Sequence, residues 1–251
     1  MQLTLLGTGA PLSPRRATLG LLVTAPGCAP LLIDTCGGFE IARQLALVGH
    51  PLADVRNIII THSHLDHAGG IPALLLANQP LDIYATAGTL ASVRGAFHAG
   101  HPEWPIHPEV RYHPAEPTAR FDLGGFQIEL FPVVHRVETT GVRVTHGSRT
   151  LVYSADSIPC DTLVAGARDA DLFVCDAFYA SADRDDDGVR ARELMHPTAC
   201  EAAQMAAQAG VGALALVHSA RYASAENIRA DASAIFTAPL SVPDDGQRYS
   251  L

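Results

Sequence analysis

Three histidines and one aspartate fall within the six residues 62–67, directly after a run of three isoleucines. The isoleucines predict a buried strand, and the Ala-Gly-Gly sequence at residues 68–70 predicts a helix entry. Because a strand sends alternate side chains to one face, the ligands at 62 and 64 are expected to share a face. Imidazole and carboxylate groups bind first-row metals, and two adjacent ions suit so tight a turn better than one. The four candidate ligands are His62, His64, Asp66 and His67.

A polar surface loop rich in histidine is the alternative, since the chain has 12 histidines among 251 residues. Such a loop would not usually follow three isoleucines and precede a Gly-Gly helix start. The metal site is therefore the better interpretation of residues 62–67.

The composition allows a sizeable core and argues against several classes of protein. Hydrophobic residues make up 48% and charged residues 17% of the chain, which argues against a largely disordered protein. The net charge of −9 argues against a broad nucleic-acid-binding surface but leaves room for a small basic patch. No segment has transmembrane length, and the first residues do not resemble a signal peptide. The five cysteines form no C-x-x-C pair, which favours reduced thiols in a cytoplasmic protein: Cys28, Cys36, Cys160, Cys175 and Cys200.

Apolar patterning predicts a chain in which runs of strands alternate with helices. Strands are expected at residues 3–6, 19–24, 30–35, 57–61, 81–85, 126–134, 141–145, 150–154, 171–175 and 213–217. Helices are expected at residues 38–48, 70–77, 89–98, 161–167, 198–209 and 225–236. The order predicts an α/β (α+β) fold with two mixed β-sheets packed face to face and helices outside, a four-layer αββα sandwich. Without a repeat or linker, residues 1–251 are expected to form a single domain.

Residues 100–117 are rich in proline and histidine and are expected to form an irregular lid or surface loop. Their histidines could form a third metal site, but solvent-exposed side chains between prolines are the better interpretation.

Three further polar residues follow apolar runs and extend the candidate metal set. His135, Asp156 and His218 each come at or just after the C-terminal end of an expected strand. Each alone would be an ordinary strand-terminating residue. Together with residues 62–67 they predict one site assembled at the edge of a packed sheet.

With these residues in view, the chain resembles the metallo-β-lactamase superfamily, and within it the ribonuclease Z-like branch. The motif at residues 61–70 identifies the superfamily, and the segments around His196 and His218 identify the branch. The resemblance covers nearly the whole length, through residues 5–11, 32–38, 61–70, 134–136, 153–157, 196–199 and 217–222.

The resemblance implies a pair of divalent metal ions. His62, His64 and His135 would hold one ion. Asp66, His67 and His218 would hold the other, and Asp156 would bridge both. Zinc is the expected metal, with manganese or iron as alternatives, because histidine and aspartate suit all three. A hydroxide bridging the ions would be the nucleophile, and Asp66 would help to orient it.

Four other residues have roles implied by the resemblance. His196 would donate a proton to the leaving oxygen, oriented by Asp176 where the branch usually carries glutamate. A simple helix-start position is the alternative for His196. Arg221 would lie near the substrate phosphate or be a surface arginine, and Asp34 would stabilise the site by hydrogen bonding without binding metal.

The long insertion that forms the tRNA-binding arm in this branch is missing. It would lie between the strands at residues 141–144 and 150–153, where only residues 145–149 remain, enough for a tight hairpin turn. Its loss removes basic residues that would grip an RNA backbone. The expected substrate is therefore a small or accessible phosphodiester.

The expected function is a binuclear metal-dependent hydrolase that cleaves phosphodiester bonds by attack of the bridging hydroxide. One alternative is a tRNA 3′-end processing endoribonuclease with a short or absent arm. Others are an arylsulfatase, phosphotriesterase or lactonase, and a non-catalytic metal-binding sensor or scaffold. The partner would be a small phosphodiester or RNA, with no membrane, and the resemblance implies a homodimer.

Overall fold

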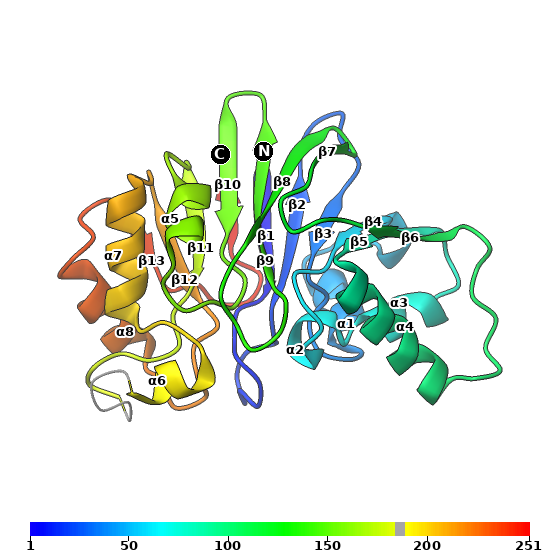
Figure 1. The fold of residues 1–251 in the computed structure, drawn as a ribbon, viewed down its shortest axis with the longest axis horizontal. Helices are drawn as coiled ribbons and strands as arrows, with labels where there is room; N and C mark the ends of the chain where they lie inside the picture. The colour runs from blue at the N-terminus through cyan, green and yellow to red at the C-terminus, as the bar shows by residue number, and fades with distance from the viewer. Residues whose placement is uncertain (184–188) are drawn as a thin grey trace.

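Two seven-stranded sheets lie face to face at the centre of the computed structural model, which describes residues 1–183 and 189–251 (Figure 1). The first sheet has the strand order β14-β1-β2-β3-β4-β5-β6 and the second the order β13-β12-β11-β10-β9-β8-β7. The strands of the first sheet are β1 (Gln2–Gly7), β2 (Gly20–Thr24), β3 (Leu31–Ile33), β4 (Asn57–Ile59), β5 (Leu81–Ala85), β6 (Val110–Pro114) and β14 (Arg248–Ser250). Those of the second are β7 (Arg120–Leu123), β8 (Phe126–Pro132), β9 (Thr140–His146), β10 (Arg149–Tyr153), β11 (Leu172–Asp176), β12 (Leu214–Val217) and β13 (Leu240–Ser241).

Helices cover the outer face of each sheet, so the molecule has four layers. Beside the first sheet lie α1 (Glu40–Leu47), α2 (Leu65–Ala68), α3 (Ile71–Leu76), α4 (Ala87–Gly100) and the 3₁₀ turn Leu52–Asp54. Beside the second lie α5 (Asp161–Ala167), α6 (Val189–Leu194), α7 (Ala199–Ala209) and α8 (Ala225–Ser233). The predicted αββα sandwich is confirmed. No helix in the described part of the chain is both long and apolar enough to cross a bilayer.

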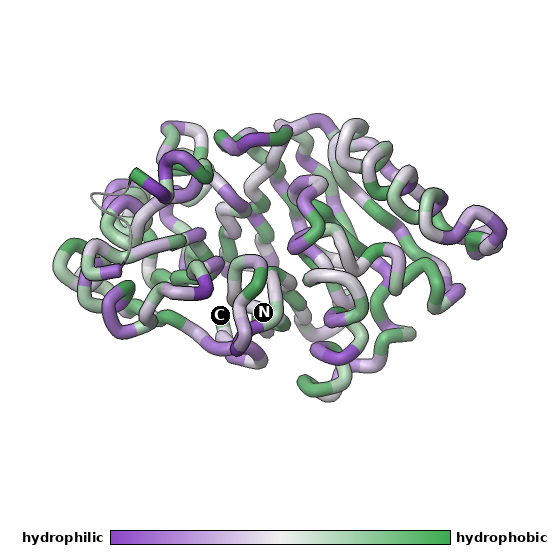
Figure 2. Tube along the Cα trace, turned by 90° about the horizontal axis from the view of Figure 1, so that it is seen from below, coloured by the Kyte–Doolittle hydropathy of each residue, from purple (hydrophilic) through white to green (hydrophobic). Residues whose placement is uncertain are grey.

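The isoleucine run of β4 shows why a central strand here must be apolar at every position. Ile59 packs into the core between the two sheets, whereas Ile58 and Ile60 pack under α1, α3 and α4. A strand covered on both faces has no solvent side on which to place polar residues. In the view of Figure 2 the strands lie between the two helical layers, and the two chain ends lie close together. The amino group of Met1 donates a hydrogen bond to the carbonyl oxygen of Leu251, 3.1 Å away.

Each sheet is antiparallel on one side and parallel on the other, which brings several strand ends to one edge. Strands β3 to β6 are parallel in the first sheet, and β10 to β13 are parallel in the second. The C-terminal ends of parallel strands are the usual place for a functional site. Three residues just past these ends have left-handed backbones that residues other than glycine rarely adopt: Asp34 (φ 57°), Ala155 (φ 53°) and His218 (φ 60°).

The prediction for residues 100–117 is wrong in one respect, because β6 forms within this segment. It pairs in parallel with β5 at the edge of the first sheet. An edge strand tolerates a terminal proline and charged side chains, so its sequence lacks the apolar run of a central strand. The patterning also missed β7, β13, β14, α2 and α6. The predicted tight hairpin is confirmed, since β9 and β10 pair from His146 opposite Arg149.

Leu21 in β2 tests the core between the sheets, because it is fully buried there. We expect Leu21→Ala to lower the free energy of unfolding by about 2–5 kcal/mol, from lost apolar contact and the resulting cavity. Leu47→Ala on α1 is the control, since that side chain is 66% exposed, and should change it by less than about 0.5 kcal/mol. Urea denaturation measures the free energy of unfolding of both variants. Equal decreases for Leu21→Ala and Leu47→Ala would contradict the proposed core.

Candidate active site

Seven polar side chains, carried by segments far apart in the sequence, meet at the shared strand edge. They form two groups of four that share Asp156, and within each group the candidate ligand atoms lie within 4.8 Å of one another. The first group is His62, His64, His135 and Asp156, and the second is Asp66, His67, Asp156 and His218. The structure therefore brings together every residue that the sequence predicted as a metal ligand.

Four imidazoles face the Asp156 carboxylate, which lies just past the end of β10. The Nε2 atom of His67 is 3.2 Å from Oδ1 of this carboxylate. On the other oxygen, Oδ2, the Nε2 atoms of His62 and His135 are both 3.7 Å away, and that of His218 is 3.6 Å away. Asp156 is 2% exposed, so this ring of nitrogens surrounds a carboxylate that is almost out of water.

The spacing of these atoms fits divalent cations. Nδ1 of His64 lies 3.2 Å from Nε2 of His135, and Oδ2 of Asp66 lies 3.2 Å from Nε2 of His218. A tetrahedral zinc with ligand distances of about 2.1 Å separates its ligand atoms by about 3.4 Å. The donor atoms of each group are therefore spaced like the corners of a metal coordination shell.

Several of these atoms are buried and make no hydrogen bond within the described residues. They are Nε2 of His62, Nε2 of His67 and Oδ1 of Asp156. A buried polar atom without a partner is unusual and destabilising. Cations bound at the two groups would satisfy all three atoms, and the donor set therefore fits divalent metal binding.

The second nitrogen of each of three imidazoles is held by a neighbour. Nδ1 of His62 lies 3.0 Å from Oγ1 of Thr61, and Nδ1 of His67 lies 2.8 Å from Oδ2 of Asp34. Nδ1 of His135 lies 3.1 Å from the carbonyl oxygen of Met195. Such contacts fix the ring orientation and leave the other nitrogen for a metal.

Asp34 is the hub of this supporting layer. Besides His67, it accepts hydrogen bonds from the backbone N–H of Thr61 at 2.9 Å and from the hydroxyl of Tyr153 at 3.3 Å. It is fully buried and belongs to neither group of candidate ligands. One carboxylate thus connects the end of β3, the residue before His62 and the second sheet.

The buried charges favour a cation at the cluster. Burial would lower the pKa of His218, but Asp156, Asp176 and Asp66 outweigh it and raise that pKa to about 10. Burial would raise the pKa of Asp66, but His67 and His218 hold it well below the usual range. Burial and the neighbouring His67 hold the pKa of His62 well below its usual value, so this ring stays neutral. A neutral imidazole is the form that binds metal.

His196 and Asp176 form a close pair beside the cluster. Nδ1 of His196 lies 2.7 Å from Oδ2 of Asp176, which leaves Nε2 on the opposite side of the ring. The ring of Phe178 stacks on the His196 imidazole with centroids 4.3 Å apart and planes 8° from parallel. The hydrogen bond to Asp176 and the stacking on Phe178 together fix the position and orientation of the imidazole ring. Asp176 and His196 also form a third group of candidate ligands with Asp156 and His218, but the hydrogen bond between them already occupies one candidate ligand atom of each residue.

A cavity of about 270 Å³ opens over these side chains. His64, Asp66, Asp156, His196 and His218 reach it, so candidate ligands and the His196 ring face the same space. The remaining wall is formed by Pro11, His135, Arg136, Phe178 and Leu194. Sequence reasoning missed Phe178 and Arg136 as site residues, although each lies within or beside a motif that it singled out.

Arg221 does not line this cavity. Its guanidinium lies over the ring of Tyr222, 4.3 Å from the centroid, on the wall of an adjoining cavity. Pro11, Phe178 and Leu194 line both cavities. The structure thus places Arg221 beside the site, one cavity away from the candidate ligands.

A four-layer αββα sandwich with clustered histidines and aspartates at its strand ends, suited to binding divalent metals, is typical of a class of metal-dependent hydrolases, and comparisons with known proteins agree. A family model described as "Beta-lactamase superfamily domain" matches residues 30–219. The chain is 32% identical over 241 residues to "Ribonuclease Z" of Mycobacterium sp. (strain KMS), covering 87% of this chain and 84% of that protein. It is 29% identical over 259 residues to "Probable metallo-hydrolase YhfI" of Bacillus subtilis (strain 168), covering 98% of each.

Solved structures give the same result. The crystal structure of YhfI from Bacillus subtilis superposes with a TM-score of 0.84 at 25% identity, over 99% of both chains. Human tRNase Z, short form, superposes with a TM-score of 0.75 at 24% identity over 100% of this chain and 99% of that one, which bears on the fold alone. The chain belongs to the metallo-β-lactamase superfamily and to its ribonuclease Z-like branch.

Asp34→Asn tests the supporting layer. The change keeps the shape of the side chain but replaces one acceptor oxygen with an amide that cannot accept from His67 or Thr61. We expect metal affinity to fall about 10- to 100-fold, the usual effect of removing an outer partner of a ligating histidine. A competition titration with a chromophoric chelator measures the affinity.

Asp82→Asn is the matched control, because Asp82 also bonds a histidine, His113, but at the edge of the first sheet. It should leave metal affinity unchanged. An Asp34→Asn protein with wild-type affinity would contradict the role of this carboxylate.

Proposed function

We propose that the protein is a binuclear metal-dependent phosphodiesterase acting on small or accessible phosphodiesters. The observation that carries this is the His196 ring, which is paired with Asp176 and faces the same cavity as side chains from both groups of candidate metal ligands. A positioned imidazole beside a metal pair suits a reaction in which a leaving oxygen must take up a proton.

Each ion has its own proposed ligand set. His62, His64 and His135 hold the first ion. Asp66, His67 and His218 hold the second, and Asp156 contacts both. Two observations support this: Asp156 is the residue common to both groups, and its two oxygens face different histidines. Zinc is the proposed metal, with manganese or iron as alternatives.

In the proposed reaction, the metal ions and the side chains of the cavity have different roles. When bound, two divalent ions polarise the phosphoryl oxygen and lower the pKa of water to about 7. Asp176 orients the His196 ring, Phe178 holds its plane, and Nε2 of His196 donates a proton to the leaving oxygen. Asp66, which reaches the same cavity, orients the attacking water.

The surface around the site favours a small substrate. The connection between β9 and β10 is a two-residue hairpin turn, too short to form an arm that grips an RNA substrate. With a net charge of −9, the chain also lacks the general attraction that binds a nucleic-acid backbone. Arg221 and Arg136, on or beside the cavity wall, are the proposed contacts for a single phosphodiester.

A tRNA 3′-end processing endoribonuclease is the second candidate. It is favoured by the 32% identity to a relative named Ribonuclease Z, which spans most of both chains. Its substrate would have to bind without the protruding arm.

His196→Ala separates proton donation from metal binding. We expect kcat toward bis(p-nitrophenyl) phosphate to fall about 10²- to 10⁴-fold, since general acid catalysis contributes that much. Metal content, measured by plasma mass spectrometry, should stay at the wild-type level because His196 is outside both ligand sets. His113→Ala removes another carboxylate-bonded histidine and should leave kcat unchanged. Parallel loss of metal and activity would instead make His196 a metal ligand.

A paired substrate assay decides between the two candidates. Metal-replete protein is given bis(p-nitrophenyl) phosphate in one reaction and a 3′-extended tRNA transcript in the other. We expect fast hydrolysis of the first and no cleavage of the second. Efficient, site-specific cleavage of the transcript would instead support the endoribonuclease. Inactivity on both substrates would contradict phosphodiester hydrolysis.

A further inference from the structure

The cavity beside the candidate metal ligands (the His196 cavity) is small, and a second cavity of about 420 Å³ adjoins it. The His196 cavity has a volume of about 270 Å³, below the range of about 300–1,000 Å³ that is usual for small-molecule sites. Most substrates would therefore extend beyond it. The adjoining cavity shares Pro11, Phe178 and Leu194 with the His196 cavity and lies next to it.

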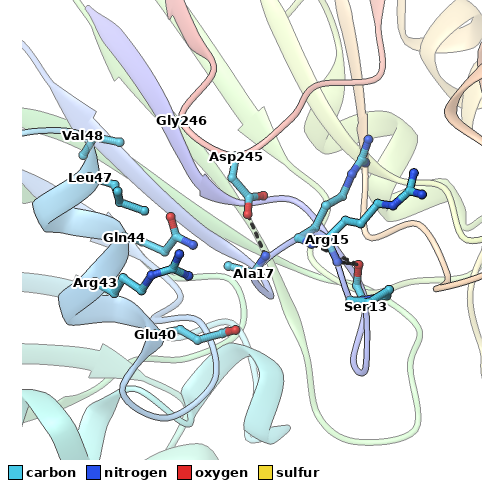
Figure 3. A pocket seen from close by; sticks show the side chains of 12 residues that line it. Ser13, Arg15, Ala17, Glu40, Arg43, Gln44, Leu47, Val48, Asp245 and Gly246 are labelled. Carbon is cyan, nitrogen blue, oxygen red and sulfur yellow. Dashed lines mark hydrogen bonds between the residues drawn. The ribbon is translucent and has the colours of Figure 1, made fainter.

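A cavity between α1 and the loops at residues 13–17 and 245–246 offers no such extension (Figure 3). It shares no lining residue with the His196 cavity. Its two carboxylates hold the loops: Oδ2 of Asp245 accepts from the backbone N–H of Ala17 at 2.7 Å, and Oε2 of Glu40 accepts from the N–H of Thr18 at 3.3 Å. Their negative charge would repel an anionic substrate.

The position of His196 indicates which part of a substrate would enter the adjoining cavity. Phe178 stacks on the His196 ring with centroids 4.3 Å apart, and it lines both cavities. In the proposed reaction, Nε2 of His196 protonates the leaving oxygen. The group attached to that oxygen would therefore lie beside His196 and pass over Phe178 into the adjoining cavity.

The walls of the adjoining cavity are mostly apolar, and its charged side chains are positive. Tyr179, Tyr222 and Leu12 line it, and Tyr222 and Leu12 are 52% and 78% exposed, so both have apolar surface available to a ligand. Among the described residues, no aspartate or glutamate lines this cavity, whereas Arg190 and Arg221 do. Such walls suit an aromatic ring, whose faces pack on other rings and attract guanidinium groups.

Backbone hydrogen bonds hold the walls of the adjoining cavity in place. The N–H of Ala10 donates to the carbonyl oxygen of Ser219 at 3.2 Å, and the N–H of Ala220 donates to the carbonyl oxygen of Phe178 at 3.0 Å. These contacts join the segments that follow β1, β11 and β12. A ligand would not have to order these walls, which favours binding.

We propose that the adjoining cavity is the subsite for the leaving group and that it selects phosphodiesters of an aromatic alcohol, with Tyr222 as a specificity-determining residue. This rests on the proposed phosphodiester hydrolysis and names its substrate class. Water forms a new bond to phosphorus while the bond from phosphorus to the leaving oxygen breaks. The leaving oxygen takes the proton from Nε2 of His196, which regains one from the attacking water, and the products are the aromatic alcohol and a phosphomonoester.

Binding of three phosphonates to the full-length, metal-loaded protein tests the subsite by isothermal titration calorimetry. The monomethyl esters of phenyl-, cyclohexyl- and methylphosphonic acid each carry one negative charge, as a phosphodiester does, and a P–C bond replaces the bond that would be cleaved. We expect the phenyl compound to bind about tenfold or more tightly than the methyl compound, because its ring is buried on apolar walls. It should bind about threefold or more tightly than the cyclohexyl compound, which has no π-face.

Equal affinity for the phenyl and methyl compounds would overturn the subsite. Equal affinity for the phenyl and cyclohexyl compounds would overturn its assignment to an aromatic group. Both comparisons use the wild-type protein and therefore need no variant to fold.

Tyr222→Ala tests the residue assigned to specificity. It should weaken binding of the phenyl compound about three- to tenfold, from loss of ring contact, and leave the methyl compound unchanged. Tyr222→Phe keeps the ring and should bind as the wild type does. Trp104→Ala is the control, because this aromatic side chain is also exposed but lines neither cavity. A Tyr222→Ala protein that is folded by circular dichroism and keeps the full preference for the phenyl compound would overturn the role of Tyr222.

Hydrolysis of bis(p-nitrophenyl) phosphate by the same preparation tests the proposed function separately. An active enzyme that binds the phenyl and methyl compounds equally would overturn the subsite alone. An inactive protein that prefers the phenyl compound would overturn the hydrolysis alone.

Discussion

The burial of Asp156 among four imidazoles is the constraint on which the rest of the site depends. A carboxylate that is 2% exposed needs positive charge or hydrogen bonds, yet one of its oxygens has no hydrogen-bond partner in the described residues. The same holds for Nε2 of His62 and Nε2 of His67. Cations between these atoms would compensate all of them at once. The fold brings the ends of parallel strands from both sheets to one edge. There, Thr61 contacts the His62 ring and Asp34 contacts the His67 ring, which fixes their orientation.

The fold class and the candidate metal ligands could be predicted from the sequence, because each is indicated by a short, local stretch of residues. The run Ile58–Ile60 indicates a strand buried on both faces, and the histidines and aspartate that follow can only lie at its end. His135, Asp156 and His218 follow apolar runs in the same way, and the family resemblance groups them with residues 62–67. The short link between β9 and β10 is also visible as a short stretch of sequence. The fold class and the branch were confirmed by the structure and the relatives.

Other features depend on contacts that no local pattern encodes. Strand β6 was missed because an edge strand needs no apolar run, and its partner β5 lies 25 or more residues earlier. The stacking of Phe178 on His196 arises from the turn after β11, and Phe178 reads as an ordinary core residue.

Anomalous diffraction from crystals grown with zinc most directly tests the claim that two cations share Asp156. We expect two peaks about 3.5–4 Å apart, one on each side of this carboxylate, with His135 ligating the first ion and His218 the second. A single peak, or peaks away from Asp156, would contradict the binuclear centre.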